Sequence, residues 1–181
     1  MRKHNGMRPQ DVAILIKIAS LPELNWTLLD LAASLHVSLS EISESLNRSR
    51  AAGLIDHSKK QVFSQNLLEF LQYGFKYVFP QMPGTIVRGV PAAHSHPYMK
   101  KFIKSEVNYV WADSEGKTMG LLIEPLYSKQ TKAIHSSPEF YEMLALADVL
   151  RIGKIREKEI AVRQLKKLLE KNEQQSKHRT N

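Results

Sequence analysis

Residues 27–55 read TLLDLAASLHVSLSEISESLNRSRAAGLI, which contains two amphipathic runs separated by three residues. Thr27 and Asp30 have the spacing of a helix N-cap pair for the first run, in which apolar residues repeat with helical periodicity. Ser38 is followed three residues later by Glu41, which is the spacing of a capping box for the second run. Gly53 is a typical residue after a helix C-terminus. The stretch therefore predicts two helices that cross at a tight turn.

The residues on either side extend this prediction to a small domain. Residues 9–19 have Pro9 at the first helical position and one apolar face, so they predict a preceding helix. After Gly53, two β-type runs flank Lys59 and Lys60 and predict a short hairpin, or wing. The predicted order is helix, helix, turn, helix and wing.

Residues 9–63 resemble the winged helix-turn-helix domain of MarR-like bacterial transcription regulators. The resemblance rests on LLDLAASLHVSLSEISESL and the following AAGLI. Ala32 lies where the two helices of such a domain approach closely, and Ile42 and Leu46 anchor its third helix. His36 occupies the turn position, where the family usually has glycine. The resemblance implies that the third helix enters the major groove of DNA.

The outward face of this third helix supplies candidate DNA contacts. With Ile42 and Leu46 directed inward, helical periodicity leaves a polar face directed outward. Hydroxyl and amide groups of such a face contact phosphates and base edges, and nearby cations contact phosphates. The predicted contact residues are Ser38, Ser40, Ser43, Glu44, Asn47, Arg48, Lys59, Lys60 and Arg8, with Arg2 and Lys3 in the same N-terminal arm.

Composition narrows the class of protein. The net charge of +8 favours polyanionic partners, although residues 1–70 are nearly neutral, with eight Lys and Arg against seven Asp and Glu. The absence of cysteine excludes disulfides, thiol catalysis and Cys-based zinc sites. No apolar run approaches the roughly 20 residues of a membrane span, and the first residues lack the apolar core of a secretory signal. We therefore expect a cytoplasmic protein without a membrane partner.

The remainder of the chain predicts two further segments. The β-type runs FKYVF, TIVRGV, VNYVWAD and KTMGLLIEPLY alternate with turn-rich stretches. Two amphipathic helices follow, divided at Gly153. The predicted class is α+β, with a winged helix-turn-helix at 9–65, a small β-rich companion module at 66–136, C-terminal helices for dimerisation at 137–172 and a disordered tail at 173–181.

Two groups of residues in the companion module suit metal chemistry, one made of histidines and one of the acidic–x–lysine type. They are His94, His96 and His135, and Asp113, Glu115 and Lys117. No further ligand stands at a recognisable spacing from the histidines, and Gly116 favours a hairpin turn at the second group. We expect no metal, no cofactor and no enzyme activity.

The sequence thus predicts a homodimeric transcription regulator, a repressor, that binds double-stranded DNA and a second copy of itself through the C-terminal helices. A small-molecule effector is left unspecified. Two alternatives stay open. One is a winged-helix protein-interaction module, such as an antitoxin-like or complex-assembly subunit. The other is a metal-dependent enzyme in the companion module.

Overall fold

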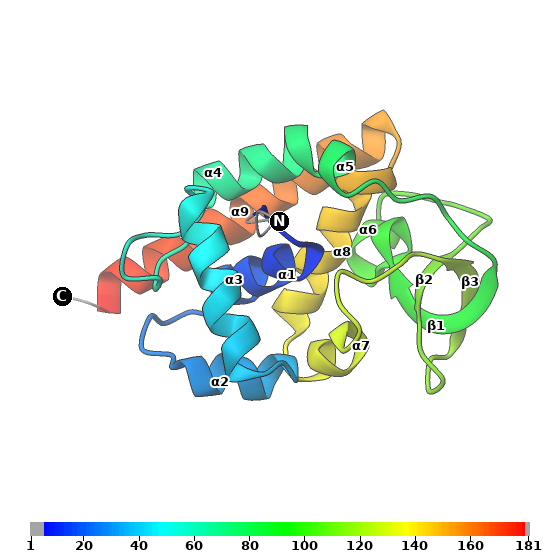
Figure 1. Cartoon of the computed structure of the whole chain (residues 1–181). Helices are drawn as coiled ribbons and strands as arrows, with labels where there is room; N and C mark the ends of the chain where they lie inside the picture. The colour runs from blue at the N-terminus through cyan, green and yellow to red at the C-terminus, as the bar shows by residue number, and fades with distance from the viewer. Residues whose placement is uncertain (1–5, 180–181) are drawn as a thin grey trace.

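The N-terminal third is helical. The computed structural model describes residues 6–179. Helices α1 (Pro9–Ala19), α2 (Leu28–Leu35) and α3 (Leu39–Ala51) lie together at one end of the molecule, and the small sheet lies at the other (Figure 1). The predicted helix-turn-helix order is therefore present in the structure.

A helical rod follows; the sequence favours a helix over NLLEFLQY, which the structure confirms, and a strand only over FKYVF, at the end of the rod. It consists of α4 (Ser64–Glu69), a π-helical segment (Phe70–Gly74) and α5 (Phe75–Val78). The prediction of a strand for FKYVF was wrong. Phe75 is fully buried and its ring lies 6.0 Å from the rings of both Phe70 and Phe79, so the helical spacing of these aromatics places them in one cluster.

Three short strands form a closed sheet. Strands β1 (Ile86–Ala92), β2 (Tyr109–Ala112) and β3 (Thr118–Leu122) each pair with the other two; β1 is antiparallel to both, and β2 and β3 are parallel. The turn at 113–116 is therefore not a hairpin, which corrects the prediction made from Gly116. This loop passes against β1, since a Cβ on Gly116 would lie 2.3 Å from the backbone of Gly89.

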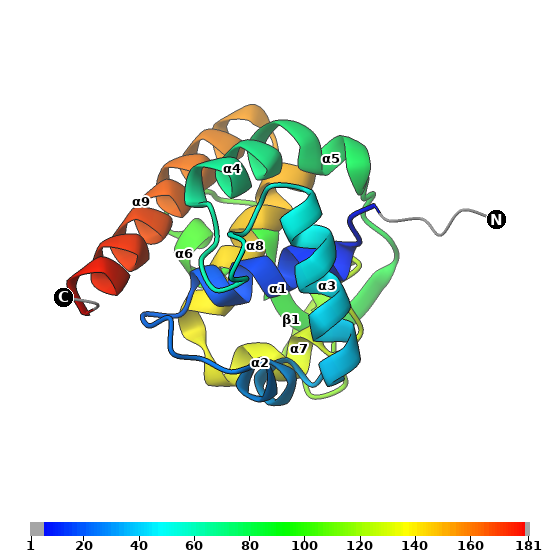
Figure 2. The ribbon, with the colours of Figure 1, turned by 60° about the vertical axis from the view of Figure 1, so that its left-hand side comes forward.

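Helix α8 (Pro138–Ile152) is the centre of the fold (Figures 1 and 2). Its residues 143–151 are all buried, and it packs against α1, α5, α9 (Ile155–Arg179) and the short helix after β1. The short helices α6 (Pro97–Lys100) and α7 (Gln130–Ala133) complete the body. One hydrophobic core contains side chains from all three predicted segments.

The C-terminal helix is longer than predicted. The expectation of a disordered tail from residue 173 was wrong as far as Arg179, where α9 ends. Helix-forming Lys, Glu and Gln dominate this part of the chain. The Asn172 amide donates to the carbonyl of Ala19 at 3.0 Å, and Lys171 pairs with Glu139 at 3.0 Å, so tertiary contacts extend to this turn.

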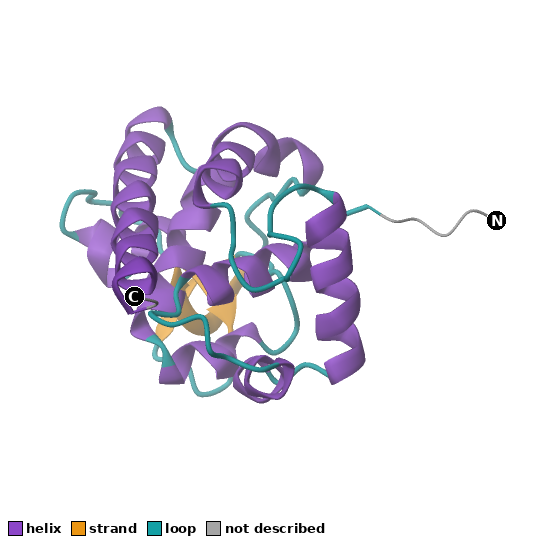
Figure 3. Cartoon of the chain, turned by 90° about the vertical axis from the view of Figure 1, so that its left-hand side faces the viewer, coloured by secondary structure: helices purple, strands orange, loops and turns teal. Residues whose placement is uncertain are grey.

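The apolar stripe of α9 faces the protein's own core. The residues of this stripe, Ala161, Leu165, Leu168 and Leu169, are buried within the chain. The prediction of dimerisation was based on Ile155, Ile160, Leu165, Leu168 and Leu169. The three leucines are buried in the protein's own core and Ile155 is exposed, so the homodimer stays a prediction. The α+β class is confirmed: helices make up most of the molecule, and the small sheet is seen behind them in Figure 3. Within residues 6–179, no helix combines the length and the apolar character that a membrane span requires.

Candidate nucleic-acid interface

Both helices of the helix-turn-helix begin with a reciprocal cap. Thr27 Oγ1 accepts a hydrogen bond from the Asp30 amide at 3.1 Å, and the Asp30 carboxylate accepts from the Thr27 amide at 2.7 Å. Ser38 and Glu41 repeat the pattern at 3.3 Å and 3.2 Å. Hydrogen bonds from these caps hold the pKa of both carboxyl groups below the ordinary values. The two predicted capping pairs are confirmed.

The turn between the helices has the backbone that the resemblance implies. His36 ends α2 in the left-handed conformation, with φ of 55°. Histidine occupies this region more readily than most residues that carry a side chain. The amide of Val37 then bonds back to the carbonyl of Ala32 at 3.1 Å, which closes α2 and directs the chain into α3.

Helix α3 presents one face to the protein and the other to solvent. Ile42, Ser45, Leu46 and Ser49 are buried against α1 and α2. The opposite face carries the exposed side chains, and α3 lies on the outside of the molecule in Figure 2. The exposed residues of this face are Ser40, Glu44, Asn47, Arg50 and Ala51, with Ser43 half-buried beside them.

Arg48 does not belong to this exposed face. Its Nε and Nη2 atoms donate to the two carboxylate oxygens of Asp11, each at 2.7 Å, and its side chain is only 12% exposed. Asp11 is fully buried at the start of α1. The predicted contact of Arg48 with guanine or phosphate would require the guanidinium to leave Asp11, and this would leave a buried carboxylate unpaired. Arg48 instead fixes the orientation of α3 on α1.

The wing is short and tightly tied. A single antiparallel bridge joins Ile55 to Val62, and the Asp56 carboxylate accepts from the amides of Lys60 at 2.8 Å and Gln61 at 2.9 Å. Lys59 lies in the turn with φ of 60° and is half-buried. The predicted hairpin is thus reduced to one bridge and a compact loop.

Lys60 is engaged inside the protein. Its ammonium group donates to the carbonyl of Trp26 and lies 4.2 Å from the centre of the Trp26 ring. This cation–π contact and hydrogen bond direct the side chain toward the loop before α2. The predicted phosphate contact by Lys60 would require the side chain to give up both interactions with Trp26.

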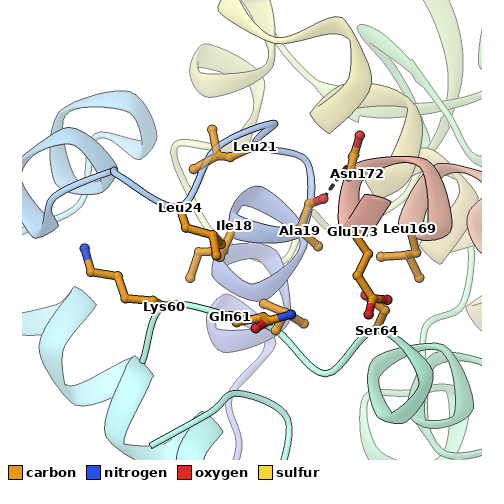
Figure 4. Close-up of a pocket in the computed structure, with 11 residues that line it drawn as sticks. Ile18, Ala19, Leu21, Leu24, Lys60, Gln61, Ser64, Leu169, Asn172 and Glu173 are labelled. Atoms are coloured by element: carbon orange, nitrogen blue, oxygen red, sulfur yellow. Dashed lines mark hydrogen bonds between the residues drawn. The ribbon is translucent and has the colours of Figure 1, made fainter. Parts of the chain in front are cut away.

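We call the helix-turn-helix and the wing, residues 9–63, the head. The head is fixed to the C-terminal helix α9. The end of α1, the wing and α9 meet around a cavity of about 30 Å³, lined by Gln61, Ser64 and Leu169 among others (Figure 4). A dashed line in Figure 4 marks the bond from Asn172 to the carbonyl of Ala19. A space of this size holds no more than about a water molecule or two, so the contact holds α9 against the base of the head.

Cations remain at both ends of the exposed face. Arg8 is exposed at the start of α1, and its charge acts on Glu41 at the start of α3. Arg50 is exposed in the last turn of α3, and it was missed from the sequence. Its position three residues after Asn47 and seven after Ser43 was the available signal. The predicted Arg2 and Lys3 lie outside the described residues.

The groups considered for metal binding do not converge. Among residues 6–179, no cluster of three or more His, Asp or Glu side chains is arranged to hold a metal ion. His94 donates from Nε2 to the carbonyl of Val107 at 2.9 Å, and His96 Nδ1 accepts from the Tyr98 amide at 3.2 Å. The Asp113 carboxylate accepts from the Glu115 amide at 2.9 Å. His96 and Asp113 thus stabilise their own turns, and His94 connects its turn to the segment before β2.

No protein-family model, no curated protein and no solved structure matches this chain. The geometry of residues 9–63 and the charges around them are therefore the basis on which a function is proposed below.

Proposed function

We propose that the chain is a sequence-specific DNA-binding transcription regulator in which α3 enters the major groove. One observation carries the proposal: α3 is fixed from behind while its outer face is exposed along its length. Ile42 and Leu46 anchor the inner face, and the pair between Arg48 and Asp11 sets its orientation. The outer face offers hydroxyl, amide and guanidinium groups, which are the groups that contact base edges and phosphates.

Positive charge, which favours DNA binding, lies at the edges of the exposed α3 face rather than at its centre. Arg8 at the start of α1, Arg50 in the last turn of α3 and Lys59 in the loop after α3 are suited to phosphate contacts. Glu44 opposes the phosphates, but Arg48 Nη1 lies 3.6 Å from its carboxylate and offsets part of that charge. With three phosphate contacts, log affinity for duplex DNA should fall against log salt with a slope of about −3 per subunit.

Repression, a cytoplasmic location and a second subunit belong to the same proposal. A protein bound at a promoter blocks polymerase without any chemistry of its own. A single head reads one half-site, so a two-fold dimer would lengthen the recognised sequence and double the salt slope.

Selection from randomised duplex DNA tests the proposal. We expect one enriched motif, and Asn47→Ala should relax the preference at one base pair, at a cost of about 1–3 kcal/mol for the preferred site. Arg50→Ala should weaken binding to all duplexes and lower the salt slope by about one. Lys117→Ala, which changes an exposed lysine in the loop between β2 and β3, is the matched control. Absence of an enriched motif, or affinity indifferent to salt, would contradict DNA reading.

A protein-interaction role for the same head is the second candidate. It is favoured by Leu29 and Leu39, which are exposed in α2 and at the start of α3. Exposed leucines gain little against a phosphate backbone but stabilise a protein interface. This alternative predicts that Leu29→Ser with Leu39→Ser abolishes binding to a protein partner, while Arg50→Ala leaves that binding unchanged.

A further inference from the structure

An exposed apolar surface lies away from α3, where the helical rod meets the start of α9. We call it the rod surface and define it by Tyr73, Tyr77, Val78 and Ile155, whose exposed fractions are 66%, 73%, 52% and 80%. The rod and α9 lie side by side in Figures 1 and 2, and α4 and α9 are in contact. Large apolar side chains that gather in one place on a protein surface mark a binding site more often than isolated ones do.

A groove runs through this surface. Its volume is about 490 Å³, and its walls include Tyr73 of the π-helical segment and Leu150, Ile155 and Val162 of α8 and α9. The five-residue π-helical segment contributes to its shape, because Leu71 and Phe75 are buried while Tyr73 points outward between them. π-Helical turns are rare and occur frequently at functional sites. The groove is wide enough for the apolar side chains of a peptide.

The rim of the groove carries excess positive charge. The Lys76 ammonium lies 4.6 Å from the centre of the Tyr77 ring, and the pKa of Lys158 is lowered by partial burial and by the charge of Lys76. Lys76 thus lies beside the exposed Tyr77, and Lys158 lines the groove itself. Arg163 lines the same groove together with one acid, Glu159. A bound carboxylate would relieve the repulsion between the two lysines.

We propose that the rod surface binds an acidic amphipathic segment of a partner protein. Apolar side chains of the segment enter the groove between Tyr73 and Ile155, and its carboxylates pair with Lys76 and Lys158. Helix-in-groove recognition combines these two elements. The site is separate from α3, so it adds a protein partner to the DNA-binding role and does not depend on it.

Charge and apolar character argue against other occupants. A second copy would bring the same lysines against themselves, and like charges in an interface cost stability. A single-stranded nucleic acid would satisfy the lysines and stack on the tyrosines, but it would leave Ile155, Leu150 and Val162 without an apolar partner. An acidic segment with apolar side chains satisfies both features.

Selection from a display library of random peptides about 15 residues long, with the full chain as target, tests the proposal. Enriched peptides should be rich in Asp and Glu and should carry aromatic or aliphatic residues at helical spacing. Tyr73→Ser with Ile155→Ser should weaken their binding by roughly tenfold or more, and so should Lys76→Glu with Lys158→Glu. Met119→Ser with Lys117→Glu makes equivalent changes at exposed positions of the sheet end and should leave binding unchanged.

Three results would overturn the proposal. The first is the absence of enrichment, or enriched peptides that are neutral, basic or insensitive to the rod-surface variants. The second is self-association in sedimentation velocity that Ile155→Ser abolishes, which would make a second copy the occupant. The third is tight binding of a single-stranded oligothymidine that Lys76→Glu with Lys158→Glu abolishes, without selection of acidic peptides. Asn47→Ala separates this site from DNA reading, since it should leave peptide binding intact.

Discussion

The helix-turn-helix head and the sheet that packs on α8 use their polar side chains differently. In the head, Thr27 and Ser38 cap their own helices through partners three residues away, and these bonds are exposed to solvent. At the sheet, the Trp111 indole donates to Asp148 at 2.7 Å, and Asp148 pairs at 2.7 Å with Arg151. Both of these side chains on α8 are almost completely buried.

This difference shows which bonds are replaceable. When an exposed capping side chain is removed, water replaces it as the partner of the backbone amide. The loss in unfolding free energy is therefore small, typically about 1 kcal/mol. A buried ion pair leaves an uncompensated charge when one member is removed, which costs about 3–5 kcal/mol. The head contains one bond of the second kind, between Asp11 and Arg48, and it orients the proposed reading helix.

The largest effect is expected at the sheet. Asp148→Ala leaves the Arg151 guanidinium buried without its anion and the Trp111 indole without its acceptor, so unfolding free energy should fall by about 4 kcal/mol. Chemical denaturation followed by tryptophan fluorescence and circular dichroism measures this loss. Glu115→Ala, at an exposed acid, is the control. Equal stability of the two variants would show that the buried network is dispensable.

Arg48→Ala should be the next most damaging change. It leaves the fully buried Asp11 unpaired, and we expect a loss of about 3 kcal/mol in unfolding free energy. Arg48→Lys keeps the charge but loses one of the two parallel hydrogen bonds, so it should restore only part of the stability. Arg50→Ala, two positions away and exposed, should leave stability unchanged. If Arg48→Ala weakened DNA binding while the fold stayed fully stable, Arg48 would be a reading residue after all.

A pH dependence should arise at the sheet end from His96. Burial, reinforced by the charge of Lys101, lowers the pKa of His96 to about 4, and its ring contacts Tyr141. The unfolded chain takes up a proton near pH 6.5 while the folded chain resists it. Stability is therefore complete above that pH and is lost as the pH falls toward 4, with about 2 kcal/mol lost by about pH 5.

His96→Asn supplies the control for this pH dependence, because its amide oxygen keeps an acceptor for the Tyr98 amide while removing the titration. Thermal unfolding of the wild type and of His96→Asn should diverge between about pH 7 and pH 5. Parallel curves would show that His96 takes up its proton at the same pH in the folded protein as in the unfolded chain.

The smallest effect is expected at an exposed cap of the head. Ser38→Ala removes the acceptor for the Glu41 amide and should cost about 1 kcal/mol. Ser38→Asp keeps a capping acceptor and should restore the stability. A loss as large as that of Arg48→Ala would mean that the start of α3 has a tertiary role.

Local patterns explain why much of the head was predictable. The caps at Thr27 and Ser38, the helical periodicity of α1 to α3 and the left-handed turn at His36 each depend on a few neighbouring residues. The outward positions of Ser40, Glu44 and Asn47 follow from the same periodicity. The α+β class follows from the change to β-type residues after the head.

Long-range contacts explain the failures. Arg48 was assigned to DNA because its partner, Asp11, lies 37 residues away in the sequence. Lys60 was predicted to contact phosphate for the same reason: its partner, Trp26, lies 34 residues away in the sequence. In FKYVF the aromatic residues occupy every second position, as in a strand. The structure forms a helix there, with Phe75 buried in the core. Short apolar runs leave that choice open when periodicity alone is used.

The salt dependence of duplex binding by Arg50→Gln with Lys59→Gln tests the central claim most directly. If the exposed edges of the head contact phosphates while Arg48 only orients α3, this variant should keep its stability, and the slope of log affinity against log salt should become shallower by about two per subunit. Unchanged affinity and unchanged slope in this variant would contradict the assignment of the α3 face as the DNA-reading surface.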